Sequence, residues 1–368
     1  MLFGIEQEIP LLRDDGKNFV DFSNTSDLEL QKIIDELPVY ASDYPILRVG
    51  DLGIKYKRWY MEGYERFDEQ GKFIKTIPKG LEIRTTPHDT IDGALNELRE
   101  SYAMLINHLN SSNFSPTWIS FNPIHNQFQP DPPLNPYELQ MRTGSPESQT
   151  AEIAELTFGP DLSLSFPDFS DAATIDAGKK LTFYSPYILP FSFSSPFADG
   201  KLWDGLSQRT FVRTGARPAV LVFLHDEKNM IESSPSLTQS SRISNETGRI
   251  EFKAFDTCRD LDLYKSLFIL LQGIIFSDSL IGRALVPDAA LHQRSAKAGF
   301  TDPTIATGAR EVIAAARKAL TGHPDIHELD RLDRMLDSNA LPVYNLIKTY
   351  HDTGSVLETL KKYSNLNI

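Results

Sequence analysis

Short segments in which apolar positions alternate or cluster occur throughout the first 255 residues of the chain. Successive side chains of a strand point to opposite faces, and fully buried strands are apolar throughout, so such segments predict β-strands. The predicted strands are Leu2–Ile9, Lys55–Phe67, Lys72–Ile77, Ala219–Phe223 and Ile250–Phe255. The second and third are joined by Asp68-Glu69-Gln70-Gly71, a turn composition that predicts a hairpin.

Helical periodicity is clear in two places within this part and throughout the rest of the chain. Apolar residues spaced three and four apart between Ile91 and Leu109 lie on one stripe, which predicts a helix of about five turns. Ser26 and Glu29 form a capping box, which predicts a helix that ends at Pro38. From residue 259 to residue 365 the pattern is a run of helices. Strands followed by helices favour the α+β class.

Two long segments have no regular pattern. The stretch from 123 to 136 contains five prolines and predicts an extended loop, because proline cannot join a strand ladder. The Ser-rich stretch from 232 to 245 predicts a mobile or substrate-facing loop.

A bare sheet face would need the C-terminal helices to cover it. We therefore expect a single catalytic domain over residues 1–368, with a strand-rich part (1–255) packed against a helical part (256–368).

Composition excludes several classes of protein. The 368 residues include 50 acidic and 37 basic side chains, a net charge of −13, so the chain would repel a nucleic-acid backbone. Its longest nearly apolar run, Leu267–Phe276, is about half as long as a bilayer requires. The lone Cys258 excludes a disulfide framework, and the acidic residues near Met1 argue against a secretory signal. We expect a cytoplasmic protein that binds neither nucleic acid nor membrane.

Charged and polar side chains lie two residues apart on several predicted strands, which places them on the same face. These rows are Glu6 with Glu8, Glu82 with Arg84, Asp161 with Ser163 and Ser165, and Glu251 with Lys253. One interpretation is that an antiparallel sheet keeps one face in water and shows this alternation everywhere. The other is a binding site, since a solvated face usually mixes Lys, Thr and Gln, whereas carboxylates lead these rows.

Carboxylates gathered on one sheet face point to a hard divalent cation. Mg²⁺ takes oxygen ligands, commonly from a few carboxylates together with substrate phosphates. Such an ion would also allow like charges to lie close together. The sequence contains no Gly-x-x-x-x-Gly-Lys-Ser/Thr loop and no Gly-x-Gly-x-x-Gly turn, so a nucleotide would be held in another way. Metal–nucleotide chemistry follows as a hypothesis.

Four segments, in the same order, resemble one protein family. Gly4-Ile5-Glu6-Gln7-Glu8 is similar to the Gly-x-Glu-x-Glu opening of the glutamate–cysteine ligase family 2. The other three are Leu81-Glu82-Ile83-Arg84-Thr85-Thr86-Pro87, Ser194-Ser195-Pro196-Phe197 with Gly200, Gly205, Ser207 and Arg209, and Gly248-Arg249-Ile250-Glu251-Phe252-Lys253 with Asp256. The resemblance covers nearly the whole chain. It implies a glutamine-synthetase-like catalytic fold, which is a mainly antiparallel curved sheet with helices on one face.

Three positions depart from the family pattern. Where the family usually has Gly-x-His-x-His, this chain has Asp161 and Ser163 in place of the two imidazoles. Aspartate is a good ligand for Mg²⁺, so this change could retune a metal site without removing it. Lys253 stands where the family has arginine, and therefore supplies a point charge in place of a bidentate fork.

The resemblance implies an ATP- and Mg²⁺-dependent carboxylate–amine ligase. In such an enzyme ATP phosphorylates a carboxylate of an amino acid, and an amine then attacks the acyl phosphate to form an amide, here a γ-glutamyl bond from glutamate to cysteine or another amine, as in glutathione biosynthesis. The implied metal ligands are Glu6, Glu8, Glu82, Asp161 and Glu251. The implied nucleotide-binding residues are Arg84, Arg209 and Lys253, and the implied catalytic residues are Arg209, Arg213 and Lys253.

Two other functions remain open at this stage. The missing imidazoles allow a non-catalytic ligand-binding or regulatory descendant of the fold. The loops 123–136 and 232–245 do not show from their residue types which substrates they would contact, so a ligase for a different acid and amine is also open. Arg84 could be a structural partner of Glu82, and Arg213 could be an ordinary surface ion-pair residue. Association into a homo-oligomer is also open.

Overall fold

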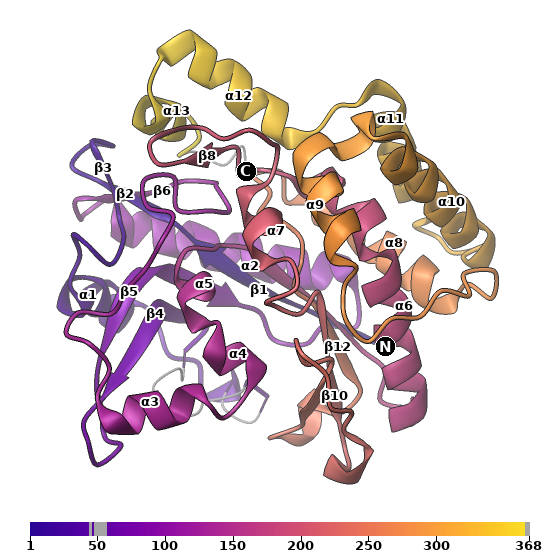
Figure 1. The fold of residues 1–368 in the computed structure, drawn as a ribbon, viewed down its shortest axis with the longest axis horizontal. Helices are drawn as coiled ribbons and strands as arrows, with labels where there is room; N and C mark the ends of the chain where they lie inside the picture. The colour runs from indigo at the N-terminus through magenta and orange to yellow at the C-terminus, as the bar shows by residue number, and fades with distance from the viewer. Residues whose placement is uncertain (44–45, 48–56, 365–368) are drawn as a thin grey trace.

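The computed structural model describes residues 1–43, 46–47 and 57–364, and its centre is a curled sheet of seven strands (Figure 1). The strands follow one another across the sheet in the order β11 (Thr238–Ser240), β10 (Val220–Leu224), β12 (Arg249–Phe252), β7 (Pro160–Ser165), β1 (Leu2–Ile9), β5 (Phe73–Arg84) and β4 (Trp59–Phe67). Neighbours are antiparallel except for β10 and β11, which are parallel.

Strand β1 lies inside the sheet, between β7 and β5, and separates two environments. Its alternating sequence buries Phe3, Ile5 and Ile9 on one face, whereas Glu6 and Glu8 point to the other. Gln7, between the two glutamates, is fully buried and donates to the Thr257 hydroxyl at 2.7 Å while its amide oxygen accepts from the hydroxyl of Tyr264 at 2.6 Å. These bonds fix β1 against the helices behind it.

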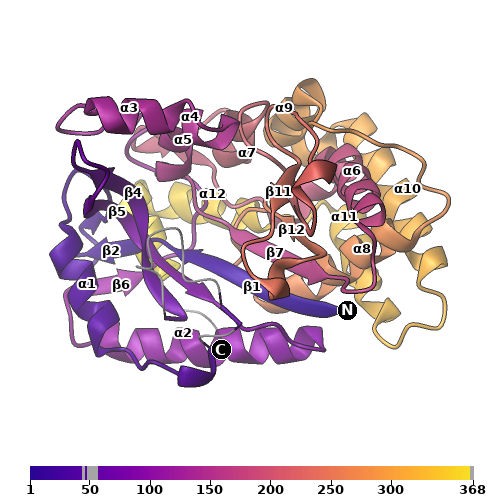
Figure 2. The same cartoon turned by 90° about the horizontal axis from the view of Figure 1, so that it is seen from below.

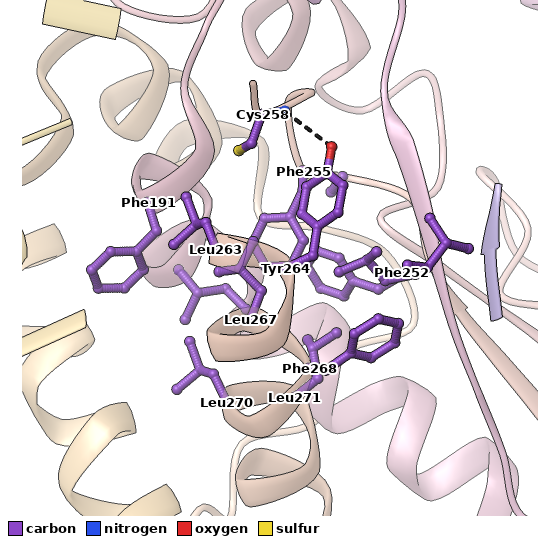
Figure 3. Packing of buried hydrophobic residues seen from close by; sticks show 14 of the residues in the cluster. Phe191, Phe252, Phe255, Cys258, Leu263, Tyr264, Leu267, Phe268, Leu270 and Leu271 are labelled. Atoms are coloured by element: carbon purple, nitrogen blue, oxygen red, sulfur yellow. Dashed lines mark hydrogen bonds between the residues drawn. The ribbon is translucent and has the colours of Figure 1, made fainter. Parts of the chain in front are cut away.

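Helices cover the apolar face of the sheet. They are α1 (Asp27–Glu36), α2 (Ile91–Leu109), α6 (Asp171–Ile188) and α8 (Asp262–Phe276), and α10 (Pro303–Ala319) packs against α6 and α8. The ring of Phe268 on α8 meets that of Phe3 on β1 edge-on, with the centroids 5.5 Å apart. Figure 3 shows this core around α8, where the backbone N–H of Cys258 donates to the Tyr264 hydroxyl at 3.0 Å. Cys258 is 1% exposed and belongs to the core.

Three short helices lie on the opposite side of the sheet, near its β4 edge (Figure 2). They are α3 (Pro136–Arg142), α4 (Pro146–Gln149) and α5 (Ala151–Glu155). The remaining helices are α7 (Gln208–Arg213), α9 (Ala289–Ala298), α11 (Leu329–Ser338), α12 (Pro342–Thr353) and α13 (Val356–Lys362). The remaining strands, β2 (Leu11–Arg13), β3 (Asn18–Phe19), β6 (Phe114–Pro116), β8 (Phe197–Ala198) and β9 (Lys201–Leu202), form two small sheets.

Most of the expected elements are confirmed. The α+β class, the mainly antiparallel sheet, the hairpin of β4 and β5 and the long helix α2 agree with the structure. Ser26 and Glu29 form the expected capping box, and α1 ends before Pro38. Residues 55 and 56 of the predicted strand Lys55–Phe67 lie outside the described residues. In the described part of the chain, helices α8 to α13 follow residue 259 as expected, and none of the helices is long and apolar enough to cross a bilayer.

Three expectations about the fold were wrong or incomplete. The part before residue 255 is not mainly strands and loops, because it contains the 18-residue helix α6. Buried residues occur on several sides of α6 and Pro186 lies inside it, so its sequence lacks a clear stripe. The Ser-rich stretch from 232 to 245 contains β11, which pairs with β10. Helices also lie on both sides of the sheet, since α3 and α5 contact β4.

Candidate functional site

The polar face of the sheet brings the predicted charged rows together. Glu6 on β1 lies between Arg84 on β5 and Asp161 on β7 in the strand register. Two residues further along β1, Glu8 is paired with Glu82. Glu251 on β12 is paired with Ser163. Because each residue is on the strand position that faces away from the core, segments far apart in the sequence meet on one surface.

Three carboxylates form what we call the Glu251 cluster, which consists of Glu6, Asp161 and Glu251. One oxygen from each lies within 4.8 Å of the others. The Lys253 ammonium forms ion pairs with Asp161 and, at 3.3 Å, with Glu251. The Arg249 guanidinium lies 3.5 Å from Glu6 and 3.9 Å from Glu251. Two cationic side chains therefore partly neutralise this cluster.

A second group, the Glu62 cluster, consists of Glu8, Glu62 and Glu82, again with one oxygen from each within 4.8 Å of the others. The Lys79 ammonium pairs with Glu8 and also donates to the carbonyls of Ala154 at 2.8 Å and Thr157 at 2.7 Å. The backbone N–H of Gly159 donates to the other Glu8 oxygen at 2.6 Å. The predicted metal ligands are thus divided between two clusters, with Glu62 as an additional member.

Burial controls the charge of the Glu251 cluster. Loss of solvent raises the pKa of Asp161 and of Glu251, and their mutual repulsion and that of Glu6 raise it further. The ammonium of Lys253 opposes both shifts. Burial lowers the pKa of Lys253, but the two neighbouring carboxylates outweigh this effect and the pKa is raised overall. The arrangement therefore holds negative charge at a cost that a cation would reduce.

Both clusters have the donor chemistry of a Mg²⁺ site. Each offers three carboxylate oxygens close enough to share one ion, and hard divalent cations prefer such ligands. In the Glu251 cluster, the carboxylate of Asp161 joins the group of oxygens. The residues present therefore fit the cation.

The predicted arginines lie in three different settings. Arg84 is on the polar face in register with Glu6, and its Nε donates to the Lys57 carbonyl at 3.1 Å. Its guanidinium carbon lies 5.1 Å from the centre of the Tyr60 ring. Arg84 therefore lines the site floor, where its role in nucleotide binding stays a prediction.

Arg209 and Arg213 share helix α7, as their spacing suggested, and both are buried. Arg209 donates to the carbonyls of Ala254 at 3.0 Å and Lys253 at 2.9 Å, and a side chain at Gly159 would collide with its guanidinium. Burial and the charge of Arg209 hold the pKa of Arg213 well below its ordinary value. Among the described residues, no ion pair joins either arginine to an acid of the two clusters.

Three residues next to the clusters were missed in the sequence. Glu62 lies in β4 among aromatic residues, Lys79 follows Pro78 in β5, and Arg249 precedes Glu251 by two positions. The period of two that selected Glu251 and Lys253 extends to Arg249, so that residue could have been found. Glu62 and Lys79 could not, because a bulge between Glu62 and Gly63 shifts the register of the hairpin.

Two cavities border the clusters. One of about 370 Å³ lies next to the Glu62 cluster, and its lining residues include Glu62, Tyr64, Lys79, Arg142, Glu155 and Arg217. A smaller one, of about 60 Å³, adjoins the Glu251 cluster and is lined by Glu6, Arg84, Ser163, Glu246 and Arg249, among others. Each cluster thus has a cavity beside it on the polar side of the sheet.

The sequence matches no protein-family model and no curated protein sequence. Solved structures do resemble the fold. A bifunctional glutathione synthetase from Pasteurella multocida superposes with a TM-score of 0.62 at 12% identity, covering 99% of this chain and 51% of that one. The ligase PafA, in its complex with the prokaryotic ubiquitin-like protein Pup, gives a TM-score of 0.50 at 12% identity and covers 99% of this chain and 72% of that chain.

These similarities establish the fold. The chain has an architecture found in a glutathione synthetase and in a protein ligase, and it spans about half the length of the synthetase. At 12% identity the likeness does not extend to substrates. Membership of the glutamate–cysteine ligase family 2 stays a prediction from the four motifs.

Proposed function

We propose that the protein is an ATP- and Mg²⁺-dependent carboxylate–amine ligase. The observation that carries the proposal is the pair of carboxylate clusters, which lie side by side on one sheet face in a fold shared with ligases. L-glutamate is the proposed acid and L-cysteine the first amine to test. The product would be a γ-glutamyl amide formed through an acyl phosphate.

The residues of the sheet face would position the phosphates and the acid. When bound, Mg²⁺ would supply positive charge to the transferred phosphoryl group. The oxygens of Glu6, Asp161 and Glu251 and those of Glu8, Glu62 and Glu82 would hold the ions. Phosphoryl transfer requires little covalent help from the protein and much charge neutralisation, which Arg249 and Lys253 would supplement at the Glu251 cluster.

Arg209 would act through position. Its bonds to the Lys253 and Ala254 carbonyls hold the chain at the end of β12. We therefore propose that Arg209 positions Lys253 and does not contact a phosphate directly. Lys253 remains the proposed catalytic cation, and Arg84 the proposed nucleotide contact on the floor. Arg213, whose charge is disfavoured by burial, remains a candidate for neutralising an incoming anion.

The test measures product formation and substrate dependence together. Purified protein with Mg²⁺ and ATP should release ADP and phosphate only when an acid and an amine are both present. The Glu251→Ala variant should lose turnover and keep a cooperative thermal transition. Full activity of that variant would refute the metal assignment, whereas ADP release that never requires an amine would refute the ligase.

One observation favours a second candidate, a ligand-binding protein without turnover. Lys253 pairs with two of the three acids of the Glu251 cluster, and so provides in part the positive charge that a metal would bring. Titration calorimetry with MgATP distinguishes the two functions. Saturable nucleotide binding without product over a long incubation with amino acids and amines would support the non-catalytic protein.

A further inference from the structure

The cavity of about 370 Å³ beside the Glu62 cluster has a wall of unusual polarity. It is enclosed by β4 on one side and by α3, α4 and α5 on the other. Lys79 connects it to the cluster, because its ammonium pairs with Glu8 and donates to the carbonyl of Ala154 on α5. A ligand in this cavity would therefore lie next to the proposed metal ligands.

Two buried side chains in this wall have no hydrogen-bond partner. Tyr64 and Glu155 are each 3% exposed, and neither the Tyr64 hydroxyl nor Oε1 of Glu155 bonds to any group in the described part of the chain. Buried polar groups are nearly always paired in folded proteins, since an unpaired one is destabilising. Because both residues line a cavity, a polar ligand group is the partner that would satisfy them.

The surroundings of Glu155 favour a cationic partner. Four charged groups act on it from neighbouring elements, namely Lys79 on β5, Glu62 on β4, Glu8 on β1 and Asp21 in the loop after β3. Burial raises the pKa of Glu155 well above its ordinary value, the three acids raise it further, and only Lys79 opposes them. An ammonium group beside Glu155 would compensate the charge of its carboxylate.

Two guanidinium groups in the same cavity have unused donors. The Nε atoms of Arg142 and Arg217 are buried and lack partners in the described chain. Arg142 lies 4.0 Å from the centre of the Tyr64 ring, and Arg217 donates to the Glu147 carbonyl at 2.7 Å, so both guanidiniums are held in place. Fixed guanidiniums bind carboxylates well. The cavity thus offers an acid for an ammonium and cations for a carboxylate.

We propose that this cavity binds the amine substrate, that this substrate is an α-amino acid, and that Glu155 accepts the proton of its ammonium group. The inference rests on the ligase function proposed above. Arg142 and Arg217 would bind the substrate carboxylate, and the Tyr64 hydroxyl would complete the contacts to the amine end. Glu155 is then a catalytic residue, because it touches the reacting nitrogen.

The chemical step balances without any further reactant. Glu155 takes one proton from the ammonium, which leaves a neutral amine with a free electron pair. That pair forms a carbon–nitrogen bond to the carbonyl carbon of the acyl phosphate supplied by the ligase reaction. The carbon–oxygen bond to phosphate breaks, and the remaining excess proton on nitrogen leaves with the phosphate. The amide, inorganic phosphate and protonated Glu155 are the products.

The experiment compares two nucleophiles in the Glu155→Gln variant. Hydroxylamine is neutral at neutral pH and traps acyl phosphates as hydroxamates without needing a base, whereas L-cysteine reacts only after losing a proton. With L-glutamate and MgATP, the variant should lose cysteine-dependent product formation by about 100-fold or more, and its hydroxamate formation should change much less. Glu152→Gln, three residues earlier on α5, is the matched control and should leave both rates unchanged.

The outcomes separate this inference from the proposed function. If wild-type protein forms neither hydroxamate nor amide, the ligase proposal fails. If Glu155→Gln keeps the cysteine rate, or loses both rates equally, the assignment of Glu155 is overturned. Should that variant not fold, Tyr64→Phe tests the same cavity, because it removes only the unpaired hydroxyl. It should raise the KM for L-cysteine and leave the rate with saturating hydroxylamine unchanged. An unchanged KM would contradict the proposal.

A second comparison tests the substrate class. Cysteamine carries the amine and thiol of L-cysteine but no carboxylate. Wild-type protein should prefer L-cysteine by kcat/KM, and Arg142→Gln or Arg217→Gln should reduce that preference. Equal use of both amines by the wild-type protein would overturn the assignment of the two arginines.

Discussion

The two faces of the central sheet use the same strands for opposite purposes. On β1, Ile5 packs into the core at 1% exposure, while its neighbour Glu6 joins two other carboxylates. The apolar face stabilises the fold by removing hydrocarbon from water. The polar face gathers like charges, raises the pKa of Asp161 and Glu251 and thereby costs stability. The free energy gained by burying the apolar face therefore offsets the cost of holding like charges together on the polar face.

The largest effect should follow from damage to the apolar face. Phe268→Ala removes a fully buried ring that contacts Phe3, and should lower the free energy of unfolding by about 4 kcal/mol. Urea denaturation followed by circular dichroism measures the loss. Phe183→Ala, at a side chain that is 39% exposed, is the control and should change little. Equal losses in both variants would contradict the division between the faces.

On the polar face, Lys79 is the side chain whose loss should destabilise most. Its side chain is 3% exposed, so Lys79→Met removes the cationic partner of Glu8 and a donor to the carbonyls of Ala154 and Thr157. Removal of one partner of a buried pair should cost about 3 kcal/mol. The same urea titration, repeated with millimolar Mg²⁺, should recover part of this loss. A variant as stable as the wild type would show that Glu8 finds another partner.

A pH titration compares a buried base with the buried acids. Burial lowers the pKa of His292, on α9, from 6.5 to about 4, and its Nε2 lies 2.7 Å from the Ser185 hydroxyl. The unfolded state binds a proton first, so this stability is present above pH 6.5 and is lost as the pH falls toward 4. Between pH 7 and pH 5 the loss should be about 2 kcal/mol.

The variant His292→Gln should lack this part of the pH dependence. Asp161 and Glu251 act with the opposite sign, since a raised carboxylate pKa gives stability at low pH that disappears as the pH rises through it. Thermal melts of both proteins from pH 5 to pH 8 separate the two contributions. Parallel curves would mean that His292 does not titrate between those values.

The smallest change should come from neutralising one acid of the Glu251 cluster. Glu251→Gln keeps the shape of the side chain and removes a charge that burial disfavours, so stability at pH 8 should rise by less than about 1 kcal/mol. The same variant should bind Mn²⁺ more weakly, as measured by electron paramagnetic resonance. A marked loss of stability would show that the Lys253 pair outweighs the repulsion.

Much of the fold could be predicted because local patterns dominate in β1, α1 and α2. Their alternation, capping box and stripe survive in the structure without change. Helix α6 could not, since it is buried on several sides and leaves no polar stripe. The three-residue strand β11 depends on pairing with β10 and not on its own sequence.

The arrangement of the candidate site could be predicted where it follows the period of two along the strands. It could not be predicted where it depends on tertiary contacts. Glu6, Glu8, Glu82, Asp161 and Glu251 do meet in two clusters on the sheet face. The position of Arg209 against backbone carbonyls could not be inferred, because residue type does not show what a guanidinium bonds. Glu155 gave no sequence signal either, since its isolation arises from the packing of α5 against β4.

Because Glu6 and Glu8 lie on one strand, the strand geometry fixes the spacing between these two residues. Alternate residues of a β-strand are separated by about 7 Å, and Gln7 anchors that spacing to the helices behind. The distance is longer than a single phosphate group. The spacing of the two clusters along β1 is therefore set by the backbone, whichever ligand occupies them.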